Sequence, residues 1–176
     1  MPDRGWELPG GYRIDLFAEQ DAVSADDVIA LWTREAVLRP EEAARRVSEV
    51  LLVATDPDRR PVGIASTYLQ HNEQLRAELW YYRAFVAASH RTADIARLLA
   101  LLGRDHLSRR YVDGTDRRGI GVIYEVENEG LKRYAHHARW PELHFTFIGE
   151  SPSGAHVYVH YFLGAPAPEP GSQGSA

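Results

Sequence analysis

Cysteine is absent from this chain, lysine occurs once, at Lys132, and no apolar run reaches the length of a membrane span. The absence of cysteine excludes disulfide bonds, thiolate metal ligands and a cysteine nucleophile. The first residues, MPDRGWELPGG, lack the apolar core of a signal peptide, so we expect a cytoplasmic protein with no membrane partner. The formal net charge of −5 lacks the basic excess typical of nucleic-acid binding, so we expect no nucleic-acid partner.

The overall composition suits one globular domain. Of the 176 residues, 44% are hydrophobic, which is enough to build a sizeable core in one domain but not in two. Residues 165–176 are mainly alanine, proline, glycine and serine with almost no apolar anchor, so we expect a disordered tail there. The sequence therefore predicts a single domain over residues 1–164.

Hydrophobic periodicity predicts a mixed α/β protein of the α+β kind. Alternating and apolar runs bounded by turn residues predict strands at 12–17, 50–54, 62–69, 78–86, 119–124, 144–148 and 156–163. Helical spacing and capping residues predict helices over 24–37, from Pro40 onward, over 92–109 and over 127–140. The predicted order is one strand, two helices, three strands, a helix, a strand, a helix and two strands.

The stretch from Ala77 to Arg110 joins a strand directly to a long helix. Its first half is aromatic and β-branched, and its second half places Ile95, Leu99 and Leu102 at helical spacing. The connection between them delivers the chain to a helix N-terminus, where several backbone N–H groups lack intrahelical partners. Because the helix dipole adds positive charge at that end, the connection predicts a site for a phosphate or another anion.

The same stretch carries a distinctive series of residues. A strand ends at Val86, and Arg91-Thr92-Ala93-Asp94-Ile95-Ala96 follows at the start of the helix, before the apolar pair Leu98-Leu99. This series resembles the signature Gln/Arg-x-x-Gly-x-Gly/Ala of the GNAT superfamily of acyl-CoA-dependent N-acetyltransferases, with Asp94 in place of the central glycine. The predicted order of elements over residues 11–163 is also that of the GNAT fold. The resemblance implies a mixed, mostly antiparallel sheet of seven strands with four helices.

The resemblance also implies where acetyl-CoA, the co-substrate, binds. The turn that holds its pyrophosphate through backbone amides would consist of Arg91, Thr92, Ala93, Asp94, Ile95 and Ala96. The end of the preceding strand would bind the pantetheine arm through Phe85, Val86 and Ala87. Asp94 departs from the family pattern, because a carboxylate beside a pyrophosphate repels it unless that carboxylate turns away or pairs with Arg91 or Arg97.

Acetyl transfer to an amine needs a base that takes a proton from the ammonium and an acid that protonates the leaving thiolate. The family commonly uses a tyrosine on its last helix as the acid, and the resemblance implies Tyr134 in that role, with a packed helix tyrosine as the alternative interpretation. The base candidates on strands that would flank the cleft are Glu78, Tyr82 and Glu125. Glu78 shares a strand face with Trp80 and Tyr82, and we assign it as the base if that face lines the cleft.

Histidines recur on the last two predicted strands. His144 would lie roughly opposite His160, and His156, Tyr158 and His160 share one strand face. The remaining residues of this hairpin look like core: Phe145, Phe147, Val157, Val159 and Tyr161. Two or three imidazoles on one face could bind zinc, but no carboxylate stands at ligand spacing with them. We therefore predict a polar acceptor-binding wall or plain surface, and no metal.

The sequence thus predicts a GNAT-like N-acetyltransferase that uses acetyl-CoA and an amine of a small molecule or peptide, with direct attack in a ternary complex. The alternative is a non-catalytic GNAT-like domain that binds a ligand or partner, motivated by Asp94 and by the imperfect pattern around Tyr134. A third interpretation, an aminoacyl-tRNA donor, is disfavoured by the acidic net charge. The last hairpin is compatible with a homodimer.

Overall fold

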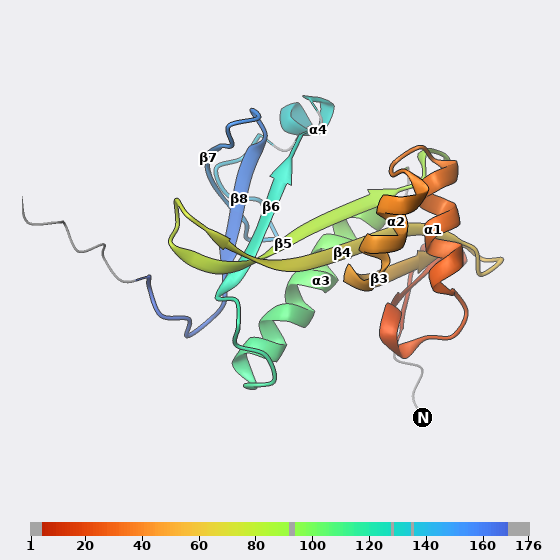
Figure 1. Ribbon diagram of the computed structural model, residues 1–176, viewed down its shortest axis with the longest axis horizontal. Coiled ribbons are helices and arrows are strands. Elements are labelled where there is room, and N and C mark those ends of the chain that lie inside the picture. The colour runs from red at the N-terminus through yellow and green to blue at the C-terminus, as the bar shows by residue number, and fades with distance from the viewer. Residues whose placement is uncertain (1–4, 92–93, 128, 135, 169–176) are drawn as a thin grey trace, which may run out of the picture. The chain divides into compact units, whose positions relative to one another are not determined.

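The computed structural model describes residues 5–91, 94–127, 129–134 and 136–168 (Figure 1). Thr92, Ala93 and residues 169–176 of the expected tail lie outside the described residues. The strands are β1 (Trp6–Glu7), β2 (Arg13–Leu16), β3 (Val50–Thr55), β4 (Pro61–Asn72), β5 (Ala77–Val86), β6 (Gly121–Val126), β7 (Thr146–Glu150) and β8 (His156–Tyr161). The α-helices are α1 (Ala25–Arg34), α2 (Pro40–Arg46), α3 (Ile95–Val112) and α4 (Glu129–Tyr134), and a 3-10 helix, η4 (Ala88–His90), precedes α3.

The strands form a mostly antiparallel sheet in the order β1-β2-β3-β4-β5-β6-β8-β7, which confirms the predicted fold class. The described residues contain eight strands rather than seven, because the short β1 pairs with β2 and is too brief for a periodic signal. Helix α4 ends at Tyr134, so its predicted end near Trp140 was wrong. Trp140 belongs instead to a turn, in which its N–H donates to the carbonyl of Phe145 at 2.9 Å.

Contacts along the chain group into two compact units, and each unit is described by itself. The first consists of Met1–Thr67 with Tyr82–Asp105, and the second of Tyr68–Tyr81 with His106–Ala176. β4, β5 and α3 contribute one part to each unit. The single domain over residues 1–164 stays a prediction. In the part of the chain that the structure describes, no helix is long and apolar enough to cross a membrane.

In the first unit, α1 and α2 cover one face of the strands and the start of α3 covers the other (Figure 1). Val53 of β3 and Ile64 of β4 are fully buried against α1 and α2. Gly63 precedes Ile64 and faces the opposite way, and a Cβ added to Gly63 would lie 3.2 Å from Ile95 Cγ2 of α3. Because side chains alternate along a strand, β4 can bury one residue under each helix layer.

Helix α1 begins with the capping box that its sequence predicts. The N–H of Ser24 donates to Asp27 Oδ2 at 2.8 Å, and the N–H of Asp27 donates to Ser24 Oγ at 3.2 Å. The hydroxyl and amide of Ser24 both lower the pKa of Asp27, because they hydrogen-bond to its ionised form. The cap starts the helix in the register that buries Val28, Leu31 and Trp32.

In the second unit, both faces of the strands carry apolar side chains. One face holds a buried cluster of Ala77, Leu79, Ile123, Val157 and Val159. The other holds a cluster of rings from Tyr124, Trp140, Phe145 and Tyr158, and burial raises the pKa of the Tyr124 phenol to about 12. The predicted faces of the last strand were wrong for two residues, since Tyr158 is 1% exposed and Tyr161 is 45% exposed. Trp140 covers Tyr158, with ring centroids 4.3 Å apart, a contact between distant parts of the chain.

Candidate functional site

The connection between β5 and α3 lies in the first unit and is held by backbone hydrogen bonds. The N–H of Ala87 donates to the carbonyl of Val62 at 2.8 Å, which ties the end of β5 to β4. The N–H of His90 donates to the carbonyl of Ala87 at 2.9 Å within η4. The N–H of Leu98 donates to the carbonyl of Asp94 at 2.9 Å, so the hydrogen bonding of α3 begins at Asp94. A strand, a tight turn and a helix N-terminus thus follow one another as the sequence predicts.

The residues predicted to bind acetyl-CoA divide by exposure. Three described members are exposed: Arg91, Asp94 and Ala96. The others are buried or half-buried: Phe85, Val86, Ala87 and Ile95. The connection therefore presents a solvent-facing surface at the start of α3, and Ile95 anchors that surface to the core.

The charged side chains of this surface are tied to neighbouring groups. Arg97 Nη2 lies 3.2 Å from Asp94 Oδ2, and the Asp94 side chain keeps 72% exposure. Arg91 Nε donates to the carbonyl of Val86 at 3.1 Å, at the end of β5. Asp94 therefore pairs with Arg97, one of the two arginines that the sequence offers it. The guanidinium offsets the negative charge of Asp94.

The packing of α3 on β5 in the first unit depends on a contact that no sequence pattern predicted. Tyr82 is buried, and its hydroxyl donates to the carbonyl of Leu99 at 2.5 Å. A Cβ added to Gly103 would lie 2.5 Å from Tyr82 Cε2 and 2.7 Å from Cζ, so the helix approaches the strand because residue 103 is glycine. Tyr82 is thus a packing residue rather than an accessible base. The available signal was a glycine inside a helical pattern.

His90 borders a polar cavity of roughly 390 Å³ in the first unit. Its Nδ1 atom lies 2.9 Å from the hydroxyl oxygen of Tyr12. Charged side chains line much of the cavity wall: Asp27, Arg34, Asp56 and Arg60. No local sequence pattern predicts this cavity, because its lining comes from separate segments of the chain.

The two catalytic candidates, Glu78 and Tyr134, belong to the second unit. Glu78 Oε1 lies 2.9 Å from His71 Nδ1, and each of these side chains is nearly half exposed. Tyr134 is the last residue of α4, and its side chain lies outside the described part of the structure. The alternative base Glu125 is exposed on β6. The roles of Glu78 as base and Tyr134 as acid stay predictions.

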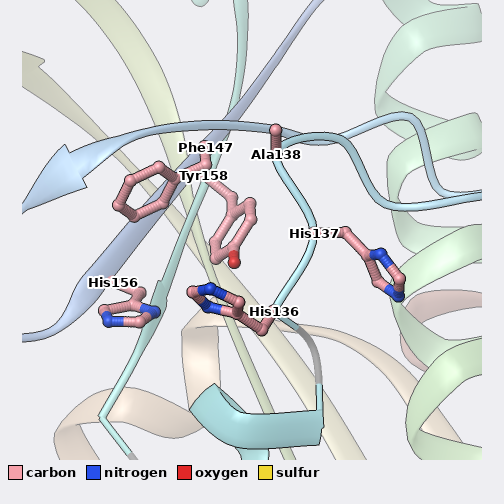
Figure 2. Close-up of a pocket in the computed structure, with 6 residues that line it drawn as sticks. All are labelled: His136, His137, Ala138, Phe147, His156 and Tyr158. Atoms are coloured by element: carbon pink, nitrogen blue, oxygen red, sulfur yellow. The ribbon is translucent and has the colours of Figure 1, made fainter.

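Histidines of the second unit line a pocket of roughly 220 Å³ (Figure 2). The side chains of His136, His156 and Tyr158 point into the same pocket, whereas the ring of His137 points away from them (Figure 2). His156 Nε2 lies 3.6 Å from Glu150 Oε1. Among the described residues, no group of three or more histidine, cysteine, aspartate or glutamate side chains could hold a metal ion.

His144 and His160 lie close together as the strand pattern predicts, but the contact joins the imidazole of His160 to the backbone of His144 and not two imidazoles. His160 Nδ1 lies 3.2 Å from the backbone oxygen of His144. The His160 ring also packs against Phe145, with centroids 5.9 Å apart. This side of the hairpin is therefore part of the ring cluster of the second unit.

Comparison with known proteins reveals similarity in structure and not in sequence. No protein-family model matches the chain, and no curated protein matches it in sequence. The structure is similar to the ribosomal-protein-S5-alanine acetyltransferase of Vibrio fischeri, with a TM-score of 0.59 and 12% identity, covering 93% of this chain and 100% of that one. It is also similar to the GNAT family N-acetyltransferase YhbS of Escherichia coli in complex with CoA, with a TM-score of 0.54 and 21% identity, covering 89% and 84% of the two chains.

A third similar structure is a mutant of the toxin AtaT bound to the C-terminus of the antitoxin AtaR and to acetyl-CoA. Its TM-score is 0.53 at 10% identity, and the match covers 85% of this chain and 93% of the toxin. At such identities the similarity establishes the fold alone. The mostly antiparallel sheet, the order of its elements and these neighbours together show that the chain has the fold of the GNAT N-acetyltransferases.

Proposed function

We propose that this protein is a GNAT-type N-acetyltransferase that moves an acetyl group from acetyl-CoA to an amine of a small molecule or peptide. The observation that carries the proposal is the connection between β5 and α3, where Asp94 pairs with Arg97 and Ala96 is exposed. The GNAT fold and the CoA complex of YhbS support it.

The connection suits a pyrophosphate on chemical grounds. A helix N-terminus offers N–H groups and the positive end of a dipole, and α3 is 18 residues long. Arg97 offsets the charge of Asp94, and Ala96 places only a methyl group on the exposed first turn. Arg91 adds a second guanidinium at the end of β5. These residues would hold the anionic part of CoA.

The transfer replaces a thioester by an amide. Acetyl-CoA supplies the activated acetyl carbonyl, to whose carbon the amine nitrogen bonds while the carbon–sulfur bond breaks. Glu78 takes the proton from the ammonium, directly or through one water, and His71 at 2.9 Å orients its carboxylate. Tyr134 gives its hydroxyl proton to the departing thiolate, so the products are the acetylated amine and the CoA thiol.

Thermal unfolding in the presence of acetyl-CoA tests the proposal. A ligand at 100 times its Kd stabilises the folded state by about 2.7 kcal/mol, which raises the Tm of a protein of this size by about 5–10 °C. Ala96→Glu places a carboxylate on the exposed first turn of α3 and should abolish that rise. Ala25→Glu makes the same change at the exposed first residue of α1 and should leave the rise intact.

Two outcomes separate the proposal from its alternative. A rise that Ala96→Glu removes, together with release of CoA thiol in the presence of amines, supports an acetyltransferase. Absence of any rise at millimolar acetyl-CoA would refute it and favour a GNAT-like domain that binds another ligand or a partner.

A further inference from the structure

The polar cavity that His90 borders, the His90 cavity, is formed by three separate segments of the first unit. Helix α1 contributes Asp27 and Arg34, the turn between β3 and β4 contributes Asp56 and Arg60, and η4 contributes His90. At roughly 390 Å³ the cavity has the size of pockets that hold small organic ligands. Its charged lining indicates a polar ligand, and the free hydrogen-bonding groups decide which kind.

The two carboxylates of the wall already accept hydrogen bonds from the protein. Asp27 Oδ2 accepts from the N–H of Ser24 at 2.8 Å and from its hydroxyl at 2.7 Å, in the cap of α1. Asp56 Oδ1 accepts from the N–H of Arg60 at 2.8 Å, across the turn between β3 and β4. Both carboxylates thus hold the backbone of the wall, and their charges repel a ligand that is negative along its whole length.

The two guanidiniums of the wall have no comparable partners. Arg34 Nε lies 3.8 Å from Glu35 Oε1, which is beyond hydrogen-bond distance. Arg60 Nη1 lies equally far, 3.8 Å, from Asp58 Oδ2. Neither guanidinium donates a hydrogen bond to another residue that the structure describes. Each therefore keeps its fork of N–H donors for a ligand.

Tyr12 holds the third potential donor, the half-buried imidazole of His90. The two rings meet edge to face with centroids 5.8 Å apart, and the Tyr12 hydroxyl oxygen lies 2.9 Å from His90 Nδ1. Because this hydroxyl occupies Nδ1, Nε2 is the ring nitrogen that remains for a ligand. When the O–H of Tyr12 donates to Nδ1, Nε2 carries the ring proton and donates in turn. The imidazole is thus fixed in the wall before any ligand arrives.

We propose that the His90 cavity binds a small organic phosphate, with Arg34, Arg60 and His90 as the donors to its phosphate group. A phosphate monoester is a dianion with three terminal oxygens, which two guanidinium forks and one imidazole N–H can share. A carboxylate has one charge and two oxygens, so it satisfies a single guanidinium fork. Pro61 and Val62 add apolar wall for a short, uncharged carbon skeleton. This site goes beyond the proposed transfer reaction and does not rest on it.

The test titrates the isotope-labelled full chain, in phosphate-free buffer, with glycerol 3-phosphate, glycerate and glycerol. These probes share a short carbon skeleton and differ in the charged group, and two-dimensional NMR measures each affinity and locates the amides that respond. Glycerol 3-phosphate should shift the amide signals of Val62 and His90 and bind about tenfold more tightly than glycerate, because it brings one more negative charge to two guanidiniums. Glycerol should shift neither signal. Equal affinity for glycerol 3-phosphate and glycerate, or shifts confined to other residues, would overturn the proposal.

Two substitutions assign the effect to the guanidiniums. Arg34→Gln and Arg60→Gln each remove one charge and should weaken glycerol 3-phosphate binding at least about fivefold. Both side chains are mainly exposed, at 66% and 76%, so the Tm of each variant should stay close to that of the parent protein. Arg45→Gln is the matched control, because Arg45 is an exposed arginine in the last turn of α2 and does not line the cavity. If either Arg34→Gln or Arg60→Gln weakens binding no more than Arg45→Gln, the site is refuted.

Acetyl-CoA itself carries phosphate groups, so the titration is repeated at saturating acetyl-CoA. A separate site keeps its affinity for glycerol 3-phosphate under these conditions. Displacement of glycerol 3-phosphate by acetyl-CoA would show that the cavity receives a phosphate of CoA, and it would overturn a site for a second ligand. A protein that binds glycerol 3-phosphate through Arg34 and Arg60 but does not bind acetyl-CoA keeps this site and loses the transfer reaction.

Discussion

Replacing Gly103 by alanine should destabilise the protein, although alanine favours helices more than glycine does. Gly103 lies in the interior of α3, where the preference for alanine is worth about 1 kcal/mol. In the structure, however, a Cβ at this position would lie 2.5 Å from Tyr82 Cε2 and 2.7 Å from Cζ. Tyr82 cannot swing away freely, because it is 3% exposed and its hydroxyl donates to the carbonyl of Leu99.

The expected loss follows from the ways in which the contact can relax. Forcing an extra methyl group into a packed core costs about 1–3 kcal/mol. Displacing the Tyr82 ring also breaks its hydrogen bond to Leu99, which is worth about 1 kcal/mol. The helix preference of alanine offsets about 1 kcal/mol of this. We therefore expect Gly103→Ala to lower the free energy of unfolding by about 1–3 kcal/mol and the Tm by roughly 2–12 °C.

Urea unfolding followed by tryptophan fluorescence measures this change. Tyr82→Leu, combined with Gly103→Ala, shortens the side chain that the new methyl group would meet. The free energy of unfolding of the double variant should therefore exceed, by at least about 1 kcal/mol, the value expected from adding the losses of the two single variants. A Gly103→Ala variant as stable as the parent protein, or more stable, would show that helix preference dominates and that α3 does not need its close approach to β5.

Two further predictions concern the transfer reaction. Asp94→Gly places the glycine of the GNAT signature at this position and removes one negative charge. This should tighten CoA binding by up to about fivefold, because a unit charge at 4 Å in water is worth about 1 kcal/mol. Calorimetric titration with CoA measures the change, and weaker binding would show that the carboxylate assists the ligand. Tyr134→Phe should lower kcat by about 10²–10⁴-fold with an unchanged acetyl-CoA affinity, and full activity in a thiol-release assay would remove Tyr134 as the acid.

Local sequence patterns predicted the course of the backbone well. The capping box of Ser24 and Asp27 starts α1 as expected, and the apolar residues that follow it are buried. The strand, turn and helix around the connection after β5 also appear where the pattern places them. The predictions missed β1, because two residues carry no periodic signal, and they extended α4 beyond Tyr134.

The partners of individual side chains were much less predictable. Sequence spacing offered Arg91 and Arg97 as partners of Asp94, and the structure selects Arg97. Strand alternation grouped Glu78 with Tyr82, but it could not show that α3 buries the tyrosine while Glu78 stays exposed beside His71. Alternation tells which residues share a face, and not what covers that face.

The sequence by itself determined the order of the elements and the strand–turn–helix connection after β5, because hydrophobic period, caps and turn residues act over a few neighbouring positions. Only the tertiary structure decided that Tyr82 packs on Gly103 and that Tyr81 stacks on Tyr68. Such contacts join segments far apart in the chain. They depend on strand register and on how closely a helix approaches a strand, and both are set by the packing of the whole core.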